Sequence, residues 1–192
     1  MSFQSWVETL MTSALGSASN TGFTTAKSVL DSGQVVNLPA NWWYSGRAVR
    51  ITATGGLVLR ANTADTFTLS IQSGTYVYLS SGAIPFTKDA LGPLPFWLDV
   101  LLTCRTAGVA TAGTPTATFM GLMRLNSAVI NLAANTAIST STHNTMLLPL
   151  TNPAATNVTA TNIAQTIDLY CAESYGTTNG IRVDQFVVEA LN

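Results

Sequence analysis

The side chains that most often carry out catalysis are few in this sequence and lie far apart. Its single histidine, His143, lies in the segment STSTHNT, which contains hydroxyl groups but no acid. A hydrolytic triad needs an acid that orients the histidine and, in one common form, a serine on a G-x-S-x-G turn, which does not occur here. The pattern therefore predicts a loop histidine in contact with solvent, and not a general base.

Two acids interrupt apolar stretches that are typical of strands, Asp99 in WLDVL and Asp168 in IDL. A glycosidase needs two carboxyl groups on one surface, and the sequence leaves open that both acids face one side of a sheet. An isolated acid in a strand more often faces solvent or pairs with an arginine. The candidate arginines are Arg105, Arg124 and Arg182. We therefore predict that the chain is not an enzyme.

The other reactive side chains lack the spacing of a metal or cofactor site. Cys104 and Cys171 lie far apart, each in an apolar stretch, and no H-x-H or C-x-x-C motif occurs. Asp65, Asp184 and Glu189 do not have the spacing of a calcium loop. We interpret the cysteines as buried free thiols, with a disulfide between them as the open alternative. We expect no metal and no cofactor.

The most unusual local feature is the aromatic run Trp42-Trp43-Tyr44, which lies between Pro39 and Gly46. Three consecutive aromatic side chains cannot all face one core, so at least one should lie at the surface. Exposed aromatic side chains are typical of protein interfaces and of sugar-binding platforms. The alternative is a plug that closes one end of a β-sandwich. We take all three residues as candidate interface residues.

Apolar residues near the start of the chain recur at spacings of three and four, which is typical of an amphipathic helix. These residues are Phe3, Trp6, Val7, Leu10, Met11 and Leu15. The spacing predicts a helix over residues 3–15, within an N-terminal arm of residues 1–23 that ends in the small-residue run GSASNTG. The apolar face packs either on its own domain or on a partner, and its residues form the second candidate interface.

Over residues 24–192 the apolar period changes to two, which predicts β-strands. Residues 49–54 alternate apolar side chains with Arg or Thr, and residues 66–72 alternate Phe, Leu and Ile with Thr, Ser and Gln. Gly55-Gly56 follows the first segment and Ser73-Gly74 follows the second. Each glycine-containing pair predicts a tight turn into the next strand.

Turn residues separate the remaining strand-like segments as well. Further strands are predicted at residues 95–106, 116–125, 128–132, 145–150, 163–173 and 181–190, and the polar stretch 134–162 is the predicted long loop or excursion. About nine or ten short strands with frequent turns favour an all-β fold, an antiparallel β-sandwich of jelly-roll type. We expect residues 24–192 to form this one domain.

The composition indicates which partners to expect. Hydrophobic residues make up 47% of the chain, but only 9% of residues are charged, against about 25% in a typical soluble domain. The net charge is −1 with no basic stripe, so we predict no binding to nucleic acid. No apolar run reaches the roughly 18 residues that a membrane helix needs, and we predict no membrane contact. A surface poor in charge favours self-association.

Four segments of the predicted sandwich resemble one protein family. Residues 46–55 (GRAVRITATG) follow the aromatic run, residues 65–71 (DTFTLSI) form a Thr-rich strand, residues 97–108 run from a tryptophan to RTAG, and residues 187–192 (VVEALN) close the chain. Together they resemble the small jelly-roll virion proteins of tailed bacteriophages. That family includes head decoration (cement) proteins and minor structural proteins.

The resemblance implies a capsid decoration protein, made in the host cytoplasm and located on the capsid surface of the virion. It implies homotrimers or similar symmetric clusters that contact the major capsid protein or another virion protein and stabilise the head shell. Two alternatives stay open. One is a tail, baseplate or head-fibre component that contacts the host, and the other is a carbohydrate-binding module with Trp42, Trp43 and Tyr44 as its stacking platform.

Overall fold

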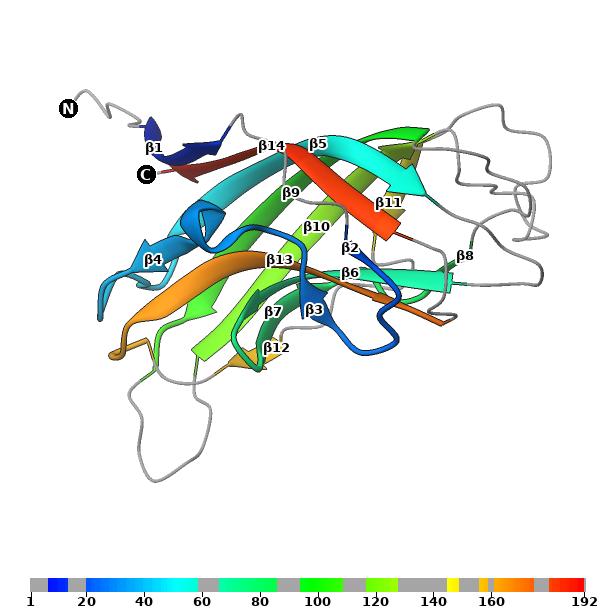
Figure 1. Cartoon of the computed structure of the whole chain (residues 1–192). Coiled ribbons are helices and arrows are strands. Elements are labelled where there is room, and N and C mark those ends of the chain that lie inside the picture. Colours follow the sequence, from blue (N-terminus) through cyan, green and yellow to red (C-terminus); the bar gives the residue numbers. More distant parts are fainter. Residues whose placement is uncertain are drawn as a thin grey trace.

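Two antiparallel β-sheets pack face to face in the computed structural model (Figure 1). The structure describes residues 7–13, 20–58, 66–85, 94–108, 117–127, 145–148, 156–158, 161–174 and 180–191. In this part of the chain all the regular elements are strands, apart from one short 3-10 helix. The prediction of an all-β antiparallel sandwich is therefore confirmed.

Among the described residues, the larger sheet has eight strands, and these include the longest ones. Its hydrogen-bonded order is β1 (Val7–Ser13), β14 (Gly180–Leu191), β5 (Ala48–Val58), β9 (Leu94–Thr106), β10 (Ala117–Ser127) and β11 (Thr145–Leu148). Two short strands are added at its sides, β2 (Asn20–Thr21) on β14 and β12 (Thr156–Val158) on β10. All these pairings are antiparallel.

The smaller sheet has six strands and lies below the larger one in Figure 1. Its order is β3 (Lys27–Ser28), β13 (Gln165–Glu173), β6 (Thr66–Ser73) and β7 (Tyr76–Ser80), with β4 (Val36–Leu38) paired to β13 and β8 (Ile84–Pro85) paired to β6. The 3-10 helix η1 (Ser32–Gln34) precedes β4. The chain repeatedly changes sheet, since β5 in the larger sheet follows β4 and precedes β6 in the smaller one.

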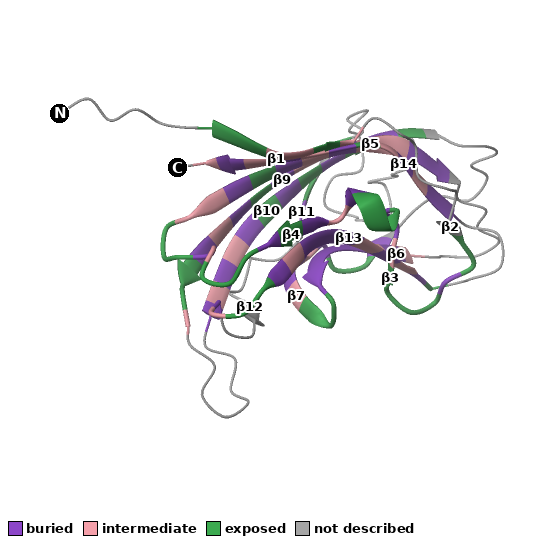
Figure 2. Ribbon diagram, turned by 60° about the vertical axis from the view of Figure 1, so that its left-hand side comes forward, coloured by how far each residue is buried: buried purple, intermediate pink, exposed green. Residues whose placement is uncertain are grey.

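The core lies between the sheets and takes alternate residues from each strand, as Figure 2 shows along the larger sheet. Val49, Ile51 and Ala53 of β5 are fully buried, which confirms the period-two prediction for this segment. Leu69 and Ile71 of β6 are fully buried on the opposite side of the core. Each buried valine, leucine or isoleucine side chain among them stabilises the fold by about 1.5–3 kcal/mol, because its apolar surface is removed from water.

An aromatic cluster in the core joins the two sheets. Tyr78 of β7 and Phe119 of β10 have ring centroids 4.8 Å apart, and Trp43 lies 4.9 Å from Phe119. The hydroxyl group of Tyr78 donates a hydrogen bond of 2.5 Å to Oε1 of Gln165 in β13. Both side chains are buried, so this bond satisfies polar atoms that have lost contact with water.

The predicted helix over residues 3–15 is wrong for the residues that the structure describes. Residues 7–13 form strand β1, which pairs with β14 from Val7 opposite Leu191 to Ser13 opposite Phe186. The register shifts at Leu10, so that Leu10 and Met11 are both partly buried against the core. A bulge of this kind lets neighbouring apolar residues share one side of a strand, and it accounts for the helix-like spacing. Residues 3–6, 14 and 15 lie outside the described residues.

The predicted turn at Gly55-Gly56 is also wrong, because β5 runs through both glycines. A Cβ atom on Gly55 would lie 1.9 Å from the backbone oxygen of Arg182 on β14. The register of β14 shifts nearby, between Val183 and Gln185. The glycine therefore serves a close backbone approach and not a turn. The turn predicted at Ser73-Gly74 is confirmed, since β6 and β7 meet there and Gly74 has φ of 58°.

The remaining strand predictions agree with the structure wherever it describes the chain. The segments 95–106, 116–125, 163–173 and 181–190 correspond to β9, β10, β13 and β14. The segment 145–150 contains β11, and the predicted strand at 128–132 lies outside the described residues. The predicted long loop at 134–162 contains β11 and β12, so it is not without strands.

Substituting Gly55→Ala should destabilise the fold, because the new methyl group meets the backbone of β14. We expect a loss of about 1–3 kcal/mol in the free energy of unfolding, the usual result of inserting a carbon into a packed site. Gly33→Ala is the matched control, since nothing lies within 4 Å of a Cβ atom at that position. Urea denaturation of both variants checks the prediction, and equal stabilities would contradict it.

Candidate functional site

The face of the larger sheet that points away from the core carries a leucine stripe, formed by Leu101 of β9, Leu122 of β10 and Leu147 of β11. These side chains are 48%, 41% and 57% exposed. Leu101 and Leu122 lie opposite each other in the register, and Leu147 lies opposite Arg124, two residues along β10 from Leu122. Cross-strand neighbours on one face lie close together and diagonal neighbours are within reach of long side chains, so the three leucines lie near one another on one exposed face, with Arg124 beside Leu147.

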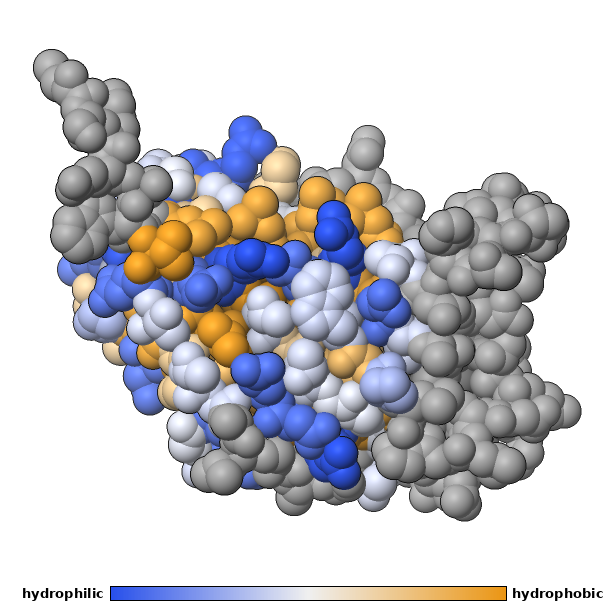
Figure 3. Space-filling view, turned by 90° about the horizontal axis from the view of Figure 1, so that it is seen from above, coloured by the Kyte–Doolittle hydropathy of each residue, from blue (hydrophilic) through white to orange (hydrophobic). Residues whose placement is uncertain are grey.

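Charged residues border the leucine stripe on its β5 side. Arg50 lies opposite Leu101, and its Nε atom donates to Oδ1 of Asp99 at 2.8 Å. Its Nη2 atom donates to Oδ2 of the same carboxylate at 3.3 Å. Glu189 lies opposite Arg50 on β14. Figure 3 looks down on this face and shows hydrophobic and hydrophilic side chains gathered in adjacent areas.

A shallow depression of about 260 Å³ lies within this face. Leu101, Thr103 and Arg105 of β9 line it together with Met120, Gly121 and Leu122 of β10. The guanidinium of Arg105 contacts the sulfur of Met120 at 3.7 Å. The arrangement offers an apolar floor with one cation at its rim, and it brings no acid and base together for catalysis.

The aromatic run divides between the core and the surface. Trp43 is 3% exposed and belongs to the core, whereas Tyr44 is 48% exposed and Trp42 is partly buried. The expectation that at least one of the three lies at the surface is confirmed. Because Trp43 points inward, the three side chains do not form one surface, and a stacking platform made of all three is not present.

The guanidinium group of Arg47 contacts both Trp42 and Tyr44. Its Cζ atom lies 3.8 Å from the centroid of the Trp42 ring and 5.1 Å from that of Tyr44. Its Nη1 atom also donates to the backbone oxygen of Trp42 at 3.0 Å. Cation–π contacts of this kind contribute about 0.5–2 kcal/mol. The aromatic run and the arginine that follows it therefore form one locally ordered corner at the start of β5.

The N-terminal candidate interface residues lie at the edge of the larger sheet as far as they are described. Val7 is 59% exposed at the start of β1, while Leu10 and Met11 are partly buried. Phe3, Trp6 and Leu15 lie outside the described residues. The role of these residues as an interface stays a prediction.

The structure separates the two acids considered for catalysis. Asp99 lies on β9 of the larger sheet and pairs with Arg50, while Asp168 lies on β13 of the smaller sheet. They do not face one surface, so a glycosidase pair is not formed. Of the arginines that the sequence proposed as partners, Arg182 pairs with Asp184, Nε to Oδ1 at 2.6 Å.

The remaining sequence candidates form no reactive centre in the described structure. Cys104 and Cys171 are buried and unpaired with each other, and burial raises the pKa of the Cys104 thiol to about 11. His143 lies outside the described residues. Within the described ranges, no three His, Cys, Asp or Glu side chains come together as ligands for a metal ion. The same ranges contain no helix of membrane-spanning length and hydrophobicity.

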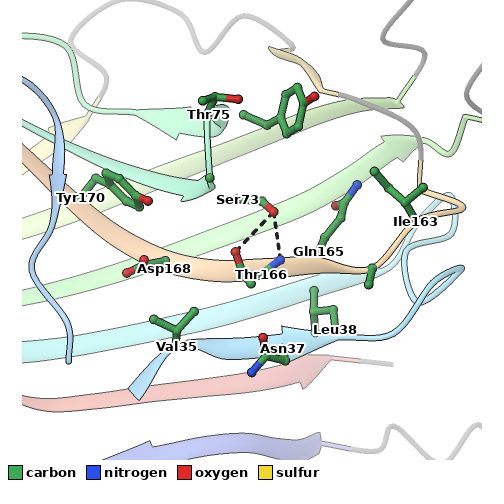
Figure 4. A pocket seen from close by; sticks show the side chains of 13 residues that line it. Val35, Asn37, Leu38, Ser73, Thr75, Ile163, Gln165, Thr166, Asp168 and Tyr170 are labelled. Carbon is green, nitrogen blue, oxygen red and sulfur yellow. Dashed lines mark hydrogen bonds between the residues drawn. The ribbon is translucent and has the colours of Figure 1, made fainter. Parts of the chain in front are cut away.

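A second surface, a cleft of about 570 Å³, lies on the outer side of the smaller sheet (Figure 4). Its lining includes apolar residues such as Val35, Leu38 and Ile163, and we name it the polar cleft for the hydrogen-bonding groups among them. Thr166, Asp168 and Tyr170 line it from alternate positions of β13. The segment before and within β4 and the β6–β7 turn form its other sides. The residues of this cleft come from three distant segments, so no local sequence motif marks it. The only signal was the alternation of Thr, Asp and Tyr on one face of a strand.

Asp168 is the buried charge of the polar cleft. It is 6% exposed, and Oδ1 accepts a hydrogen bond of 2.9 Å from the hydroxyl group of Ser28. Burial raises the pKa of Asp168 from 3.8 to about 6, against the opposing effect of the Ser28 hydrogen bond. Burial also raises the pKa of Tyr170, and the negative charge of Asp168 adds to the increase.

The raised pKa predicts how Asp168 affects stability. Between its ordinary pKa of 3.8 and its folded pKa of about 6, the folded chain binds the proton more tightly than the unfolded chain does. Lowering the pH through this window therefore stabilises the wild type relative to Asp168→Asn, which has no proton to bind. We expect the free energy of unfolding of the variant, minus that of the wild type, to be largest at about pH 8 and to fall towards about pH 4. Urea denaturation across this range measures the difference, and a constant difference would contradict the prediction.

Comparisons with known proteins identify no relative from sequence. No protein-family model matches the chain, and no curated protein matches it. Among solved structures, one match is the CBM2 module of evolved Dit from Lactobacillus casei BL23 phage J-1, with 8% identity, a TM-score of 0.31, and 82% of this chain and 68% of that chain covered. Another is fructofuranosidase from Schwanniomyces occidentalis complexed with fructose, with 7% identity and a TM-score of 0.26. That match covers 97% of this chain but 34% of the fructofuranosidase. Neither match assigns the chain to a family, because both TM-scores are low. The fold assignment therefore comes from the strand pairing of this chain alone.

Proposed function

We propose that the chain is a non-enzymatic structural protein of a bacteriophage virion, a capsid decoration protein that assembles with copies of itself on the head. The observation that carries the proposal is the leucine stripe on an exposed sheet face of a chain with only 9% charged residues. Exposed apolar side chains that gather on one face are typical of interaction sites. Few charges oppose the approach of a second copy.

The residues that resemble phage virion proteins have structural roles consistent with this proposal. In the segment 46–55, Arg47 orders the aromatic corner and Arg50 pairs with Asp99 beside the leucine stripe. The segments 97–108 and 187–192 supply β9 and β14, which are the two neighbours of β5 in the larger sheet. Three of the four segments therefore lie on the sheet whose outer face we propose as the interface, while residues 66–71 form part of β6 in the smaller sheet.

We also propose that the sandwich is a jelly roll, in which eight strands wrap as two Greek keys. Taking β1, β3, β5, β6, β7, β9, β13 and β14 as the first to the eighth strand, one sheet has the order first-eighth-third-sixth. The other has the order second-seventh-fourth-fifth. This interleaving supports the assignment, with β10, β11 and β12 as an extension beyond the sixth strand. In our proposal this extension supplies two of the three leucines.

A virion protein of the tail, baseplate or head fibre is the second candidate, favoured by the polar cleft on the smaller sheet. Such a component contacts the host and needs a ligand site that assembly does not cover. The cleft lies on the face opposite to the leucine stripe, since the two surfaces are the outer sides of two packed sheets.

The double substitution of Leu101→Thr and Leu122→Thr should weaken self-association. Threonine keeps the β-propensity of these positions but removes most of the apolar surface. We expect the oligomer of the wild type, a trimer under this proposal, to dissociate to monomers in sedimentation velocity experiments. Ile163→Thr is the control, because Ile163 is 45% exposed but lines the polar cleft on the other sheet. An unchanged oligomer in the double variant, or a monomeric wild type, would argue against the proposed interface.

The location on the head needs a separate test, cryo-electron microscopy of the virions whose genome encodes the chain. We expect density for the sandwich on the outer surface of the capsid, at positions of local symmetry, with the larger sheet facing a neighbouring copy. Density in the tail or baseplate alone would replace the decoration role by the second candidate. Absence from the virion would refute both.

A further inference from the structure

The polar cleft has hydrogen-bonding groups on three sides, and none of these groups belongs to the leucine stripe. Asn37 of β4 lies on one side, Ser73 and Thr75 at the β6–β7 turn lie on another, and Thr166 and Asp168 of β13 lie between them (Figure 4). The Ser73 hydroxyl group accepts a bond of 2.9 Å from the Thr166 amide, which fixes the turn against β13. The cleft is therefore held open by contacts within the fold. Its volume of about 570 Å³ lies in the range of about 300–1,000 Å³ that is usual for ligand sites.

Aromatic side chains border the polar groups. Tyr170 follows Asp168 on the same face of β13. Tyr76 lines the cleft from the start of β7. Tyr76 is 40% exposed and Tyr170 is partly buried, so both rings retain surface that a ligand could cover. Tyrosine offers a large apolar ring together with a polar hydroxyl group, which suits a ligand with both C–H and O–H groups.

The charges of the cleft restrict the class of ligand. Its described lining contains one carboxylate, that of Asp168, and no Lys, Arg or His. A phosphate or another anion would meet a like charge and no cation. A quaternary ammonium ion could approach Asp168 and the tyrosines, but it has no group that could form hydrogen bonds with the Asn37 amide or the Thr75 hydroxyl group. A neutral ligand rich in hydroxyl groups uses all of them.

We propose that this cleft binds a neutral saccharide, with Asp168 accepting hydrogen bonds from sugar hydroxyl groups and Tyr76 and Tyr170 covering the apolar faces of the sugar rings. Asp168 is suited to this role because burial has already removed most of its water. Ser28 supplies one hydrogen bond to the carboxylate, and hydroxyl donors of a ligand would add the charge-assisted bonds that it lost on burial. Asn37 and Thr166 then form hydrogen bonds with the remaining hydroxyl groups of the sugar.

Isothermal titration calorimetry of the full chain tests the proposal. The probes are the methyl glycosides of glucose, galactose, mannose, rhamnose and N-acetylglucosamine, with choline chloride as a cationic comparison. We expect saturable binding of at least one glycoside with a Kd on the order of 1 mM or below. Asp168→Asn and Tyr170→Ala should each weaken it by about tenfold or more. Tyr76→Ala, a change at an exposed position, should also weaken it and does not depend on the folding of a buried site.

Tyr44→Ala is the matched control, because Tyr44 is an exposed tyrosine outside the cleft. We expect its affinity to equal that of the wild type. Absence of saturable binding to all five glycosides, binding of choline alone, or an equal loss in the Tyr44 variant would each overturn the proposal. The double Leu101 and Leu122 variant should retain full saccharide affinity as a monomer. Failure of the saccharide site and failure of the assembly interface are therefore distinguishable.

Discussion

The contact between the two sheets around Tyr78 is an interaction on which both candidate surfaces depend. Its ring packs against Phe119 of the larger sheet, and its hydroxyl group bonds to Gln165 of β13. Burial raises the pKa of Tyr78 to about 12, so the hydroxyl group stays protonated and remains a donor at any physiological pH. Because β7 and β13 line the polar cleft and β10 carries part of the leucine stripe, this buried contact links the strands that carry the two candidate surfaces.

The layered architecture separates the two proposed activities. Alternate residues of each strand enter the shared core, and the residues between them face outward on opposite sides of the molecule. The outer side of the larger sheet is available for copies of the chain, while the outer side of the smaller sheet stays accessible to a ligand. Assembly through the outer side of the larger sheet would therefore leave the outer side of the smaller sheet uncovered. This arrangement would let a capsid-bound protein contact a glycan at the same time.

The strands were predictable from sequence where burial is one-sided, and less so where a backbone contact overrides the local pattern. Val49, Ile51 and Ala53 follow the period of a strand and are buried as expected. Gly55-Gly56 has the composition of a turn, yet Gly55 is placed by the backbone of β14, which lies far away in sequence. In the same way, the bulge at Leu10 exists only because β14 offers an edge for pairing. Neither the role of Gly55 nor the bulge at Leu10 can be predicted from the residues next to it in sequence.

The candidate surfaces were predictable to a smaller extent. Low charge indicated self-association, and the aromatic run indicated a special corner, but the face on which each residue lies depends on strand register. A shift of one residue would send Leu101 and Leu122 into the core. The polar cleft could not be foreseen, because Asn37, Ser73 and Asp168 become neighbours only through the pairing of β4 and β6 with β13.

The bulge in an edge strand of the larger sheet has a consequence for the form of any assembly. β1 lies at one edge of that sheet, and its register with β14 shifts between Thr9 and Met11. An irregular edge strand is a poor template for the addition of another strand. Growth by edge-to-edge pairing would produce filaments without end, and this fold disfavours it. Copies that meet through their faces instead can close around a symmetry axis, which limits the assembly to a finite number of subunits.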